Sequence, residues 1–389
     1  MNRPEAAIFK NPAKINAGYR ALETIPRELT WRGSSRPLLL LDSTSRHVKK
    51  KIVISFQGSQ MALLIHHMDR QLPISDAVSK LIHCYQTNGC DAIIASGAPA
   101  LLDMARLLNM AVSQDNPLPL HQLVVTDHLR PLVAVICESG QALHLTESIN
   151  LEGRHFGAIG LMPSLMIIDD RLTAGIRWPS ALSDGLATLT LACETLTFGQ
   201  ADHFRQIYAH SALKGVVTHL PSVLLKPRKH SSKTSLIAAE LCAGLSAGMR
   251  RCHPSWVLAG QIAAQTSFAK GMVAALTLPF ALDQGRTLPH GRPDLLLMAL
   301  GDNDCNSKVC TQKLDPWDAA LDCLNQLLDH IRSIKPGCLP QNLHRSGLGI
   351  DRLEAVATHA AGTLDKTWDV PALEKILKRA ILIRSAAAA

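Results

Sequence analysis

The sequence has few aromatic residues, no closely paired cysteines and no long apolar run. Phe, Tyr and Trp make up 4% of the 389 residues, so the core has to be built from aliphatic side chains. No two cysteines stand as Cys-x-x-Cys, which argues against a zinc knuckle or a dithiol redox motif. No apolar stretch approaches the ~18–20 residues that span a bilayer, and none follows the N-terminus as in a secretory signal. We therefore expect a globular, cytoplasmic protein with no membrane partner.

The formal net charge of +8 raises the question of a nucleic-acid partner. Basic residues gather at 47–51 and at 226–233. Neither cluster is interleaved with the aromatic side chains on which bases stack, and no nucleic-acid-binding motif accompanies them. We interpret both clusters as solvated loops and expect no nucleic-acid partner, although a basic surface would attract an anionic cofactor or substrate.

The first half of the chain alternates between short apolar runs and amphipathic stretches. Apolar runs bounded by turn residues are typical of strands that are buried on both faces. Apolar residues at helical spacing lie between them. This alternation predicts βαβ crossovers and a mainly parallel, Rossmann-like sheet. Strands are expected at 37–42, 61–67, 90–97 and 131–136, helices at 74–85 and 100–108, and a strand followed by a turn at 161–173.

From about residue 180 the pattern becomes helical throughout. A chain of this length favours two domains, each long enough to bury its own core. We predict an α/β domain of nucleotide-binding type at 1–176 and an all-helical domain at 177–389. Helices are expected at 184–198, 203–219, 234–249, 255–276, 315–333, 351–362 and 371–384.

Asp184 and Thr188 lie one turn apart in the first helix expected in the second half. Side chains at positions i and i+4 project from the same face of a helix and can converge on one ion. A metal-binding helix would carry Asp-x-x-x-His here, whereas this chain has a threonine in the second position. The pair therefore indicates a metal-binding helix that has lost one ligand.

An α/β domain followed by a helical domain, with these motifs, resembles the iron-containing (group III) alcohol dehydrogenases. Leu-Met-Pro-x5-Asp-x2-Leu begins at Leu161 near the join, and Pro289-His290-Gly291 lies deep in the second half. Residues 9–15 are similar to the family's opening and residues 337–360 to its helical close. The resemblance implies the two-domain, dehydroquinate synthase-like fold, a small alcohol or aldehyde as substrate, and a homodimer.

In that family NAD(P) binds in the cleft between the domains, and a divalent metal polarises the alcohol or carbonyl oxygen during hydride transfer. The family's pyrophosphate loop corresponds to residues 97–106, where Gly97, Ala98 and Asp103 are the expected contacts. Pro99 removes one N–H donor from this loop. A plain strand–turn–helix would give the same pattern.

Two further positions bear on the cofactor. Gly140 is the one match to the family's second cofactor loop, and Glu138 beside it would repel a phosphate. Asp42, at the end of a predicted strand, could accept hydrogen bonds from the adenosine ribose and disfavour a 2′-phosphate. This would favour NAD over NADP, with NADP remaining possible. A simple turn role for Asp42 is the alternative.

The resemblance assigns Asp184 and His290 to the site of the family's Fe²⁺ or Zn²⁺. Thr188 and Leu276 stand where two further histidines are expected. Catalytic metal sites generally use three or more protein ligands, so stoichiometric metal binding is doubtful here. His290 could instead act without metal as the catalytic group that polarises a carbonyl, or could simply anchor its loop.

Two functions follow from these observations. The first is an NAD(P)-dependent oxidoreductase that interconverts a small alcohol and its aldehyde or ketone in the interdomain cleft. The second is a catalytically impaired or inactive homologue that keeps the fold for binding or assembly. Whether a nicotinamide nucleotide binds distinguishes the two, and the sequence leaves catalytic activity open.

Overall fold

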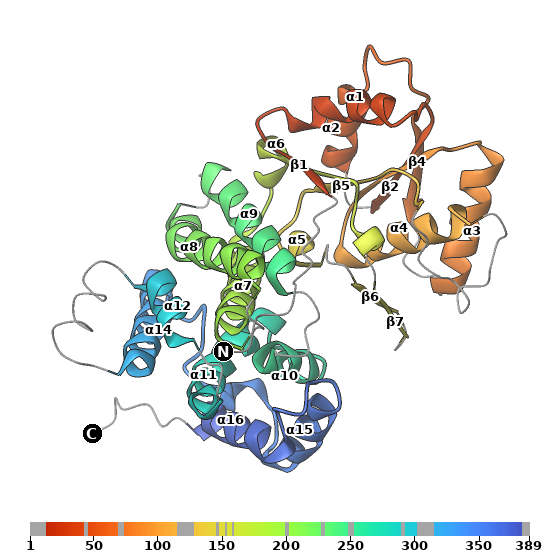
Figure 1. The fold of residues 1–389 in the computed structure, drawn as a ribbon. Helices are drawn as coiled ribbons and strands as arrows, with labels where there is room; N and C mark the ends of the chain where they lie inside the picture. The colour runs from red at the N-terminus through yellow and green to blue at the C-terminus, as the bar shows by residue number, and fades with distance from the viewer. Residues whose placement is uncertain are drawn as a thin grey trace. The chain divides into compact units, whose positions relative to one another are not determined.

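The described residues form two compact units, one α/β and one helical, which divide between Ile176 and Arg177 (Figure 1). Each unit has its own core, as expected for segments of this length. The structure is a computed structural model that describes residues 13–42, 46–68, 74–114, 128–144, 148–151, 154–157, 159–198, 202–226, 230–247, 253–288, 292–301 and 315–382.

The first unit contains a six-stranded sheet in which every pairing is parallel, so the predicted fold class is confirmed. The strand order is β1-β8-β5-β4-β2-β3, and a separate antiparallel hairpin is formed by β6 and β7. The four central strands are buried along their whole length, as expected where helices cover both faces. The strands are β1 Lys14–Gly18, β2 Pro37–Asp42, β3 Leu64–Met68, β4 Ala92–Ser96, β5 Leu132–Ile136, β6 Ser148–Leu151, β7 Arg154–Gly157 and β8 Leu165–Asp169.

Helices cover the two faces of this sheet. On one face, alternate strand residues such as Leu39 and Leu41 form a core with α1 (Ile25–Trp31) and α2 (Arg46–Ser55). On the other face, α4 (Pro99–Val112) packs against β2, β4 and β5, and α3 (Ile74–Thr87) packs on α4. Figure 1 shows α1 and α2 on the opposite side of the strands from α3 and α4.

The basic stretches are a correction to the sequence analysis, which placed both in loops. Residues 47–51 belong to α2, because Val48 and Ile52 stand four positions apart and are both buried. Lysine is a good helix former, and its long stem lets the ammonium remain in solvent. In the second stretch, Lys233 lies in α9 (His230–Ala247) and is buried. Residues 227–229 lie outside the described part of the chain.

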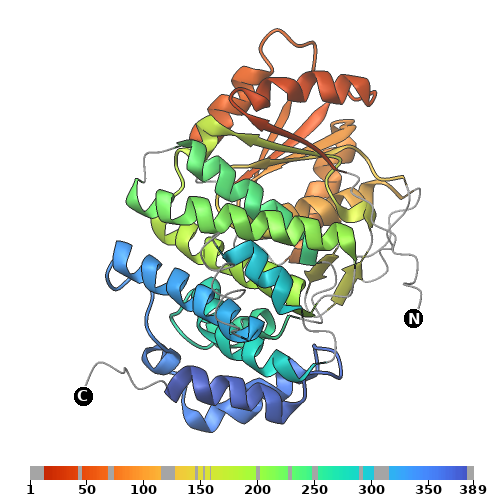
Figure 2. The ribbon, with the colours of Figure 1, turned by 60° about the vertical axis from the view of Figure 1, so that its left-hand side comes forward.

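The second unit consists of helices. The long helices α7, α8 and α9 lie side by side (Figure 2), and α11 packs on both α7 and α10. The expected helix at 255–276 is two helices, because the chain turns at 264–269, where a Thr266 side chain accepts the N–H of Phe268. The long helices are α7 Trp178–Phe198, α8 His203–Leu225, α10 Pro254–Ala263, α11 Lys270–Gln284, α12 Pro293–Leu300, α14 Pro316–Ile334, α15 Leu353–Ala361 and α16 Val370–Leu382. The short helices of the second unit are η5 Gly285–Thr287, η6 Leu343–Ser346 and η7 Ile350–Arg352, and those of the first unit are η1 Ala21–Thr24, α5 Gln141–His144, η3 Ile159–Leu161 and α6 Asp170–Thr173.

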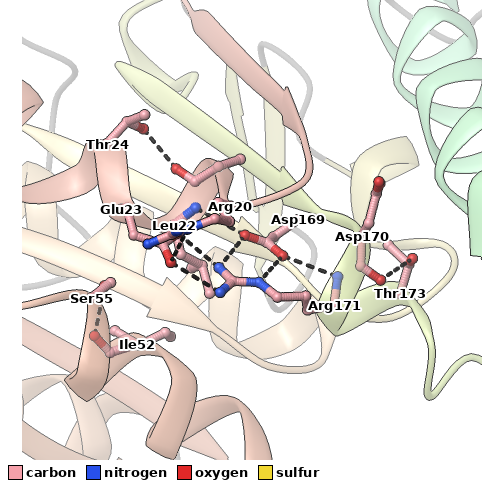
Figure 3. A network of polar contacts seen from close by, with 11 residues as sticks. Arg20, Leu22, Glu23, Thr24, Ile52, Ser55, Asp169, Asp170, Arg171 and Thr173 are labelled. Atoms are coloured by element: carbon pink, nitrogen blue, oxygen red, sulfur yellow. Dashed lines mark hydrogen bonds and ion pairs between the residues drawn. The ribbon is translucent and has the colours of Figure 1, made fainter.

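The aspartate of the Leu-Met-Pro-x5-Asp motif is Asp169, and its role in the fold is structural (Figure 3). Its carboxylate accepts the N–H groups of Leu22 and Arg171, each at 3.0 Å. The Arg171 guanidinium bridges Asp169 and Glu23. Burial alone would raise the pKa of Asp169, but the guanidinium and the two amides hold it below its usual range. The motif therefore fastens the end of β8 to η1.

Candidate functional site

The carboxyl ends of β2 and β4 flank the point where the strand order of the sheet reverses. From β2 the chain continues to β3 at one edge, whereas from β4 it continues to β5 in the opposite direction. Ligands of open parallel sheets bind in the crevice at such a reversal. Asp42 ends β2, and Gly97 and Ala98 directly follow β4. The topology therefore places three of the predicted cofactor residues at this position.

Asp42, Gly97 and Ala98 are in direct contact. The Asp42 carboxylate is 3% exposed, and its Oδ2 accepts the N–H of Ala98 at 2.7 Å. A Cβ on Gly97 would lie 2.5 Å from the same oxygen, so no other residue fits there without movement. Asp42 thus fixes the loop after β4, which is the turn role that the sequence left open. A ribose-binding role for the carboxylate stays a prediction.

The loop after β5 is joined to the loop after β4 by a residue that the sequence analysis did not single out. Gln141 is fully buried, and its Oε1 accepts the N–H groups of Cys137 at 2.8 Å and Glu138 at 3.1 Å. Its amide nitrogen donates to the Gly97 carbonyl oxygen. Gly140 has a φ of +82°, a conformation that favours glycine. The signal available in the sequence was a glutamine directly after a glycine.

Asp103 lies one turn inside α4 and faces a buried cation. Its Oδ1 accepts from Arg106 Nη1 at 2.8 Å, and Arg106 Nε donates to the Leu161 carbonyl oxygen at 3.0 Å. Burial lowers the pKa of the Arg106 guanidinium, while the Asp103 carboxylate opposes that shift. Pro99 occupies the first turn of α4, as the sequence indicated, and no side chain caps the helix start. Asp103 is therefore held in place by Arg106 in this structure.

The predicted metal helix is α7, and its two marked residues differ in environment. Asp184 is partly exposed, whereas Thr188 is fully buried and donates its hydroxyl to the Asp184 carbonyl oxygen at 2.7 Å. Thr188 is thus engaged by its own helix. Leu276 is buried in α11. His290 lies outside the described residues, and within them no three His, Cys, Asp or Glu side chains gather to hold a metal ion. The metal ligands predicted at Asp184 and His290 therefore stay a prediction.

The start of α11 is pressed against the turn of α7 that carries Asp184. A Cβ on Gly271 would lie 1.7 Å from the Ser183 carbonyl oxygen and 3.1 Å from the Ala187 nitrogen. Helix α11 therefore meets this turn at Lys270–Gly271, whereas Leu276 is about 7 Å farther along the helix axis. The sequence analysis did not single out Lys270.

Helix α10 is anchored to α7 by buried polar groups that the sequence analysis also missed. Glu194 is fully buried and accepts the Ser255 N–H at 2.7 Å, and the Thr195 hydroxyl lies 2.9 Å from His253 Nε2. Burial raises the pKa of Glu194 to about 8, because few donors replace the lost water. Hydrogen bonds from Ser255 and the backbone amide of Trp256 oppose this rise in the pKa. Glu194 thus fixes the first turn of α10.

Membrane insertion finds no support in the helices that the structure describes, since none combines sufficient length with sufficient apolarity to cross a bilayer.

Comparisons with known proteins relate the chain to one family. The family model described as iron-containing alcohol dehydrogenase matches residues 12–170. The EutG protein of Escherichia coli K12, named a probable alcohol dehydrogenase, is 26% identical over 53% of this chain, and the match spans 54% of that protein. The EutG protein of Salmonella typhimurium LT2, of the same description, is 23% identical over 80% of this chain and 82% of its own length.

A solved structure extends the similarity to both units. The sulfoacetaldehyde reductase from Bifidobacterium kashiwanohense, determined in complex with NAD⁺, matches 98% of this chain and all of its own, with a TM-score of 0.80. At 15% identity this match concerns the fold alone. The sequence matches and the fold thus make the chain similar to the iron-containing alcohol dehydrogenases.

Proposed function

We propose that this protein is an NAD(P)-dependent oxidoreductase that interconverts a small alcohol and its aldehyde or ketone. The observation that carries the proposal is the contact between Asp42, Gly97 and Ala98 at the strand-order reversal of the sheet. A buried carboxylate that fixes a glycine loop at this edge is suited to binding a dinucleotide. Similarity to an oxidoreductase family supports the same reaction class.

The charges beside this loop favour NAD over NADP. Asp42 ends β2, and Glu138 is exposed in the loop after β5. A 2′-phosphate on the adenosine would bring two negative charges close to these carboxylates, whereas the ribose hydroxyls of NAD would not. When bound, the nicotinamide supplies or accepts the hydride. The chain itself contributes the loop after β4, which Asp42 and Gln141 hold in place and against which the nucleotide packs.

A nucleotide-binding measurement tests the proposal. NADH should raise the melting temperature, since a ligand at 100 times its dissociation constant adds about 2.7 kcal/mol of stability, and NADPH should raise it less. Gly97→Ala should abolish the shift, because its Cβ would displace Asp42. Gly175→Ala is the matched control in the same unit, because the atom nearest to its added Cβ would lie 3.9 Å away. The absence of any shift with either nucleotide at millimolar concentration would leave only a non-catalytic role in binding or assembly.

Two further expectations belong to this proposal. The family resemblance implies a homodimer, and β1 is suited to an interface because it is an edge strand whose residues are mostly exposed. Light scattering after gel filtration measures the subunit number directly. A cytoplasmic location remains the expectation for such an enzyme, and fractionation of cells that express it provides the measurement.

A further inference from the structure

A lysine starts, through its backbone, from the part of the helical unit where the family resemblance points to a metal. Lys270 is the first residue of α11, and the next residue, Gly271, abuts the backbone of Ser183 in the turn that carries Asp184. The close approach is possible only because Gly271 has no side chain. The backbone of Lys270 therefore lies next to the turn of α7 that carries Asp184, the predicted metal ligand.

The ammonium group of Lys270 is held by α10. Its Nζ lies 3.6 Å from the centroid of the Trp256 indole, close enough for a strong cation–π contact. One turn farther along α10, Gly260 lies beside the lysine: a Cβ there would be in ordinary van der Waals contact with Nζ, at 3.5 Å. Lys270 is partly exposed, whereas Trp256 is buried. The charge is thus positioned on one side by a rigid aromatic face and remains reachable from another.

The position of Trp256 is itself determined by α7. The buried Glu194 carboxyl draws the first amides of α10 toward it, and Thr195 contacts His253 directly before that helix. Helix α7 therefore sets both the start of α11, through Ser183, and the indole on which the ammonium rests. Lys270 is thus held between two helices, α10 and α11, that both contact α7.

We propose that the Lys270 ammonium binds and polarises the carbonyl oxygen of the substrate, in place of a metal ion. The inference rests on the oxidoreductase function proposed above and names the group that acts on the oxygen. One observation favours it over a metal: the Thr188 hydroxyl is committed to its own helix. In the proposed arrangement the lysine charge would also repel a divalent cation. The substrate class is a small aldehyde or ketone, and its reduction at this site uses no Lewis acid.

The chemistry balances without a metal. During reduction the carbonyl carbon accepts a hydride from reduced nicotinamide, and the π electrons of the C=O bond move to oxygen. The oxygen forms an O–H bond with a proton from Lys270 Nζ, whose N–H bond breaks, and the amine regains a proton from solvent. Carbonyl, reduced nicotinamide and one proton thereby give alcohol and oxidised nicotinamide.

Substitution of Lys270 tests the proposal on the full-length protein. We would measure NADH oxidation with propanal and butanal in EDTA, and NADH affinity by fluorescence titration. Lys270→Met should lower kcat by about 100-fold or more, the loss typical when a group that stabilises a developing oxyanion is removed. The NADH dissociation constant should stay unchanged, and Lys270→Arg should retain part of the activity because it keeps the charge.

Lys335→Met is the matched control. Lys335 Nζ lies 3.9 Å from the Trp178 ring in the same unit, so this variant also removes a lysine–tryptophan contact, at a different place. It should keep the wild-type kcat. If Lys270→Met melts at a much lower temperature than Lys335→Met, Lys270→Arg carries the test through its retained charge.

The outcomes separate this inference from the proposed function. Wild-type protein that binds NADH and reduces an aldehyde only after Zn²⁺ or Fe²⁺ is added would overturn the role of Lys270 and leave the oxidoreductase function intact. The same conclusion follows if Lys270→Met reduces aldehydes as fast as wild type. Wild-type protein that binds no nucleotide and reduces no aldehyde would overturn both.

Discussion

Replacement of Glu194 by glutamine should change how the stability of the helical unit depends on pH. The carboxyl group is fully buried, and its pKa is raised to about 8 from 4.5 because burial disfavours the charged form. Between these values the unfolded chain is deprotonated while the folded chain keeps its proton. The free energy of unfolding therefore falls as pH rises through this window, by ~1.4 kcal/mol per pH unit and up to about 5 kcal/mol in all. Below pH 4.5 and above pH 8 this contribution is constant.

Glu194→Gln keeps an oxygen that can accept the Ser255 N–H but cannot ionise. Urea unfolding from pH 5 to pH 9, followed by tryptophan fluorescence, reports mainly on the helical unit, because Trp31 is the one tryptophan outside it. The wild-type protein should lose several kcal/mol over this range relative to the variant. Thr190→Val is the control: its hydroxyl bonds the Leu186 carbonyl oxygen in the same buried helix, so its cost should be equal at every pH.

Parallel pH profiles for wild type and Glu194→Gln would refute this reasoning. They would mean that Glu194 carries a charge in the folded protein or that water reaches it, and that the anchoring of α10 has been misjudged. A Thr190→Val difference that varies with pH would instead assign the dependence to another group in the helical unit.

Three further predictions concern the two sites. Gly97→Ala should remove NADH binding while leaving secondary structure intact, as measured by fluorescence titration and circular dichroism, because its Cβ would lie 2.5 Å from Asp42 Oδ2. Asp169→Asn should cost about 3 kcal/mol at pH 7 by breaking a buried ion pair. Because the pKa of Asp169 is lowered in the folded protein, this difference should shrink as pH falls below about 4, where the carboxylate of the unfolded chain becomes protonated first. Urea unfolding at pH 7 and pH 3 measures the change. Thr188→His combined with Lys270→His should raise Zn²⁺ affinity strongly, as measured by competition with a chromophoric chelator; unchanged affinity would mean that α7 and the start of α11 do not face one site.

The parallel sheet could be predicted from the sequence because its central strands are uniform apolar runs. Residues 37–42 and 131–136 contain little besides aliphatic side chains, and only a strand buried on both faces tolerates that composition. Helix α2 was missed because its lysines dominate the segment, while two apolar residues four apart decide its conformation. Local charge was given more weight there than periodicity.

The contact between Asp42 and Gly97 was only partly predictable. Each residue was recognised as the end of a strand, but the strand order that makes β2 and β4 neighbours is a property of the whole sheet. The loop at 97–98 and the glutamine at 141 meet because β4 and β5 are also neighbours. Sequence patterns indicate where strands end and leave the lateral order of those ends undetermined.

Lys270 could not be predicted, because nothing near it in the sequence marks it as functional. Its meaning arises from two contacts between helices: Gly271 against Ser183, and the ammonium over Trp256. The family resemblance pointed instead to Leu276, which is buried farther along α11. A lysine at a helix start is ordinary in sequence and becomes notable only when the neighbouring helices are placed.

Thr188, one turn after Asp184, has its hydroxyl satisfied by the helix backbone without an ion. A helix that lost a metal ligand to an apolar residue would keep its aspartate and gain a cavity, whereas Thr188 fills the space and bonds its own helix at 2.7 Å. A lysine at the start of α11 adds the charge that an ion would have brought, and the indole of Trp256 holds it. If Lys270 supplies this charge, the helical unit does not need a bound ion in order to fold. We therefore expect chelators to leave its melting temperature unchanged.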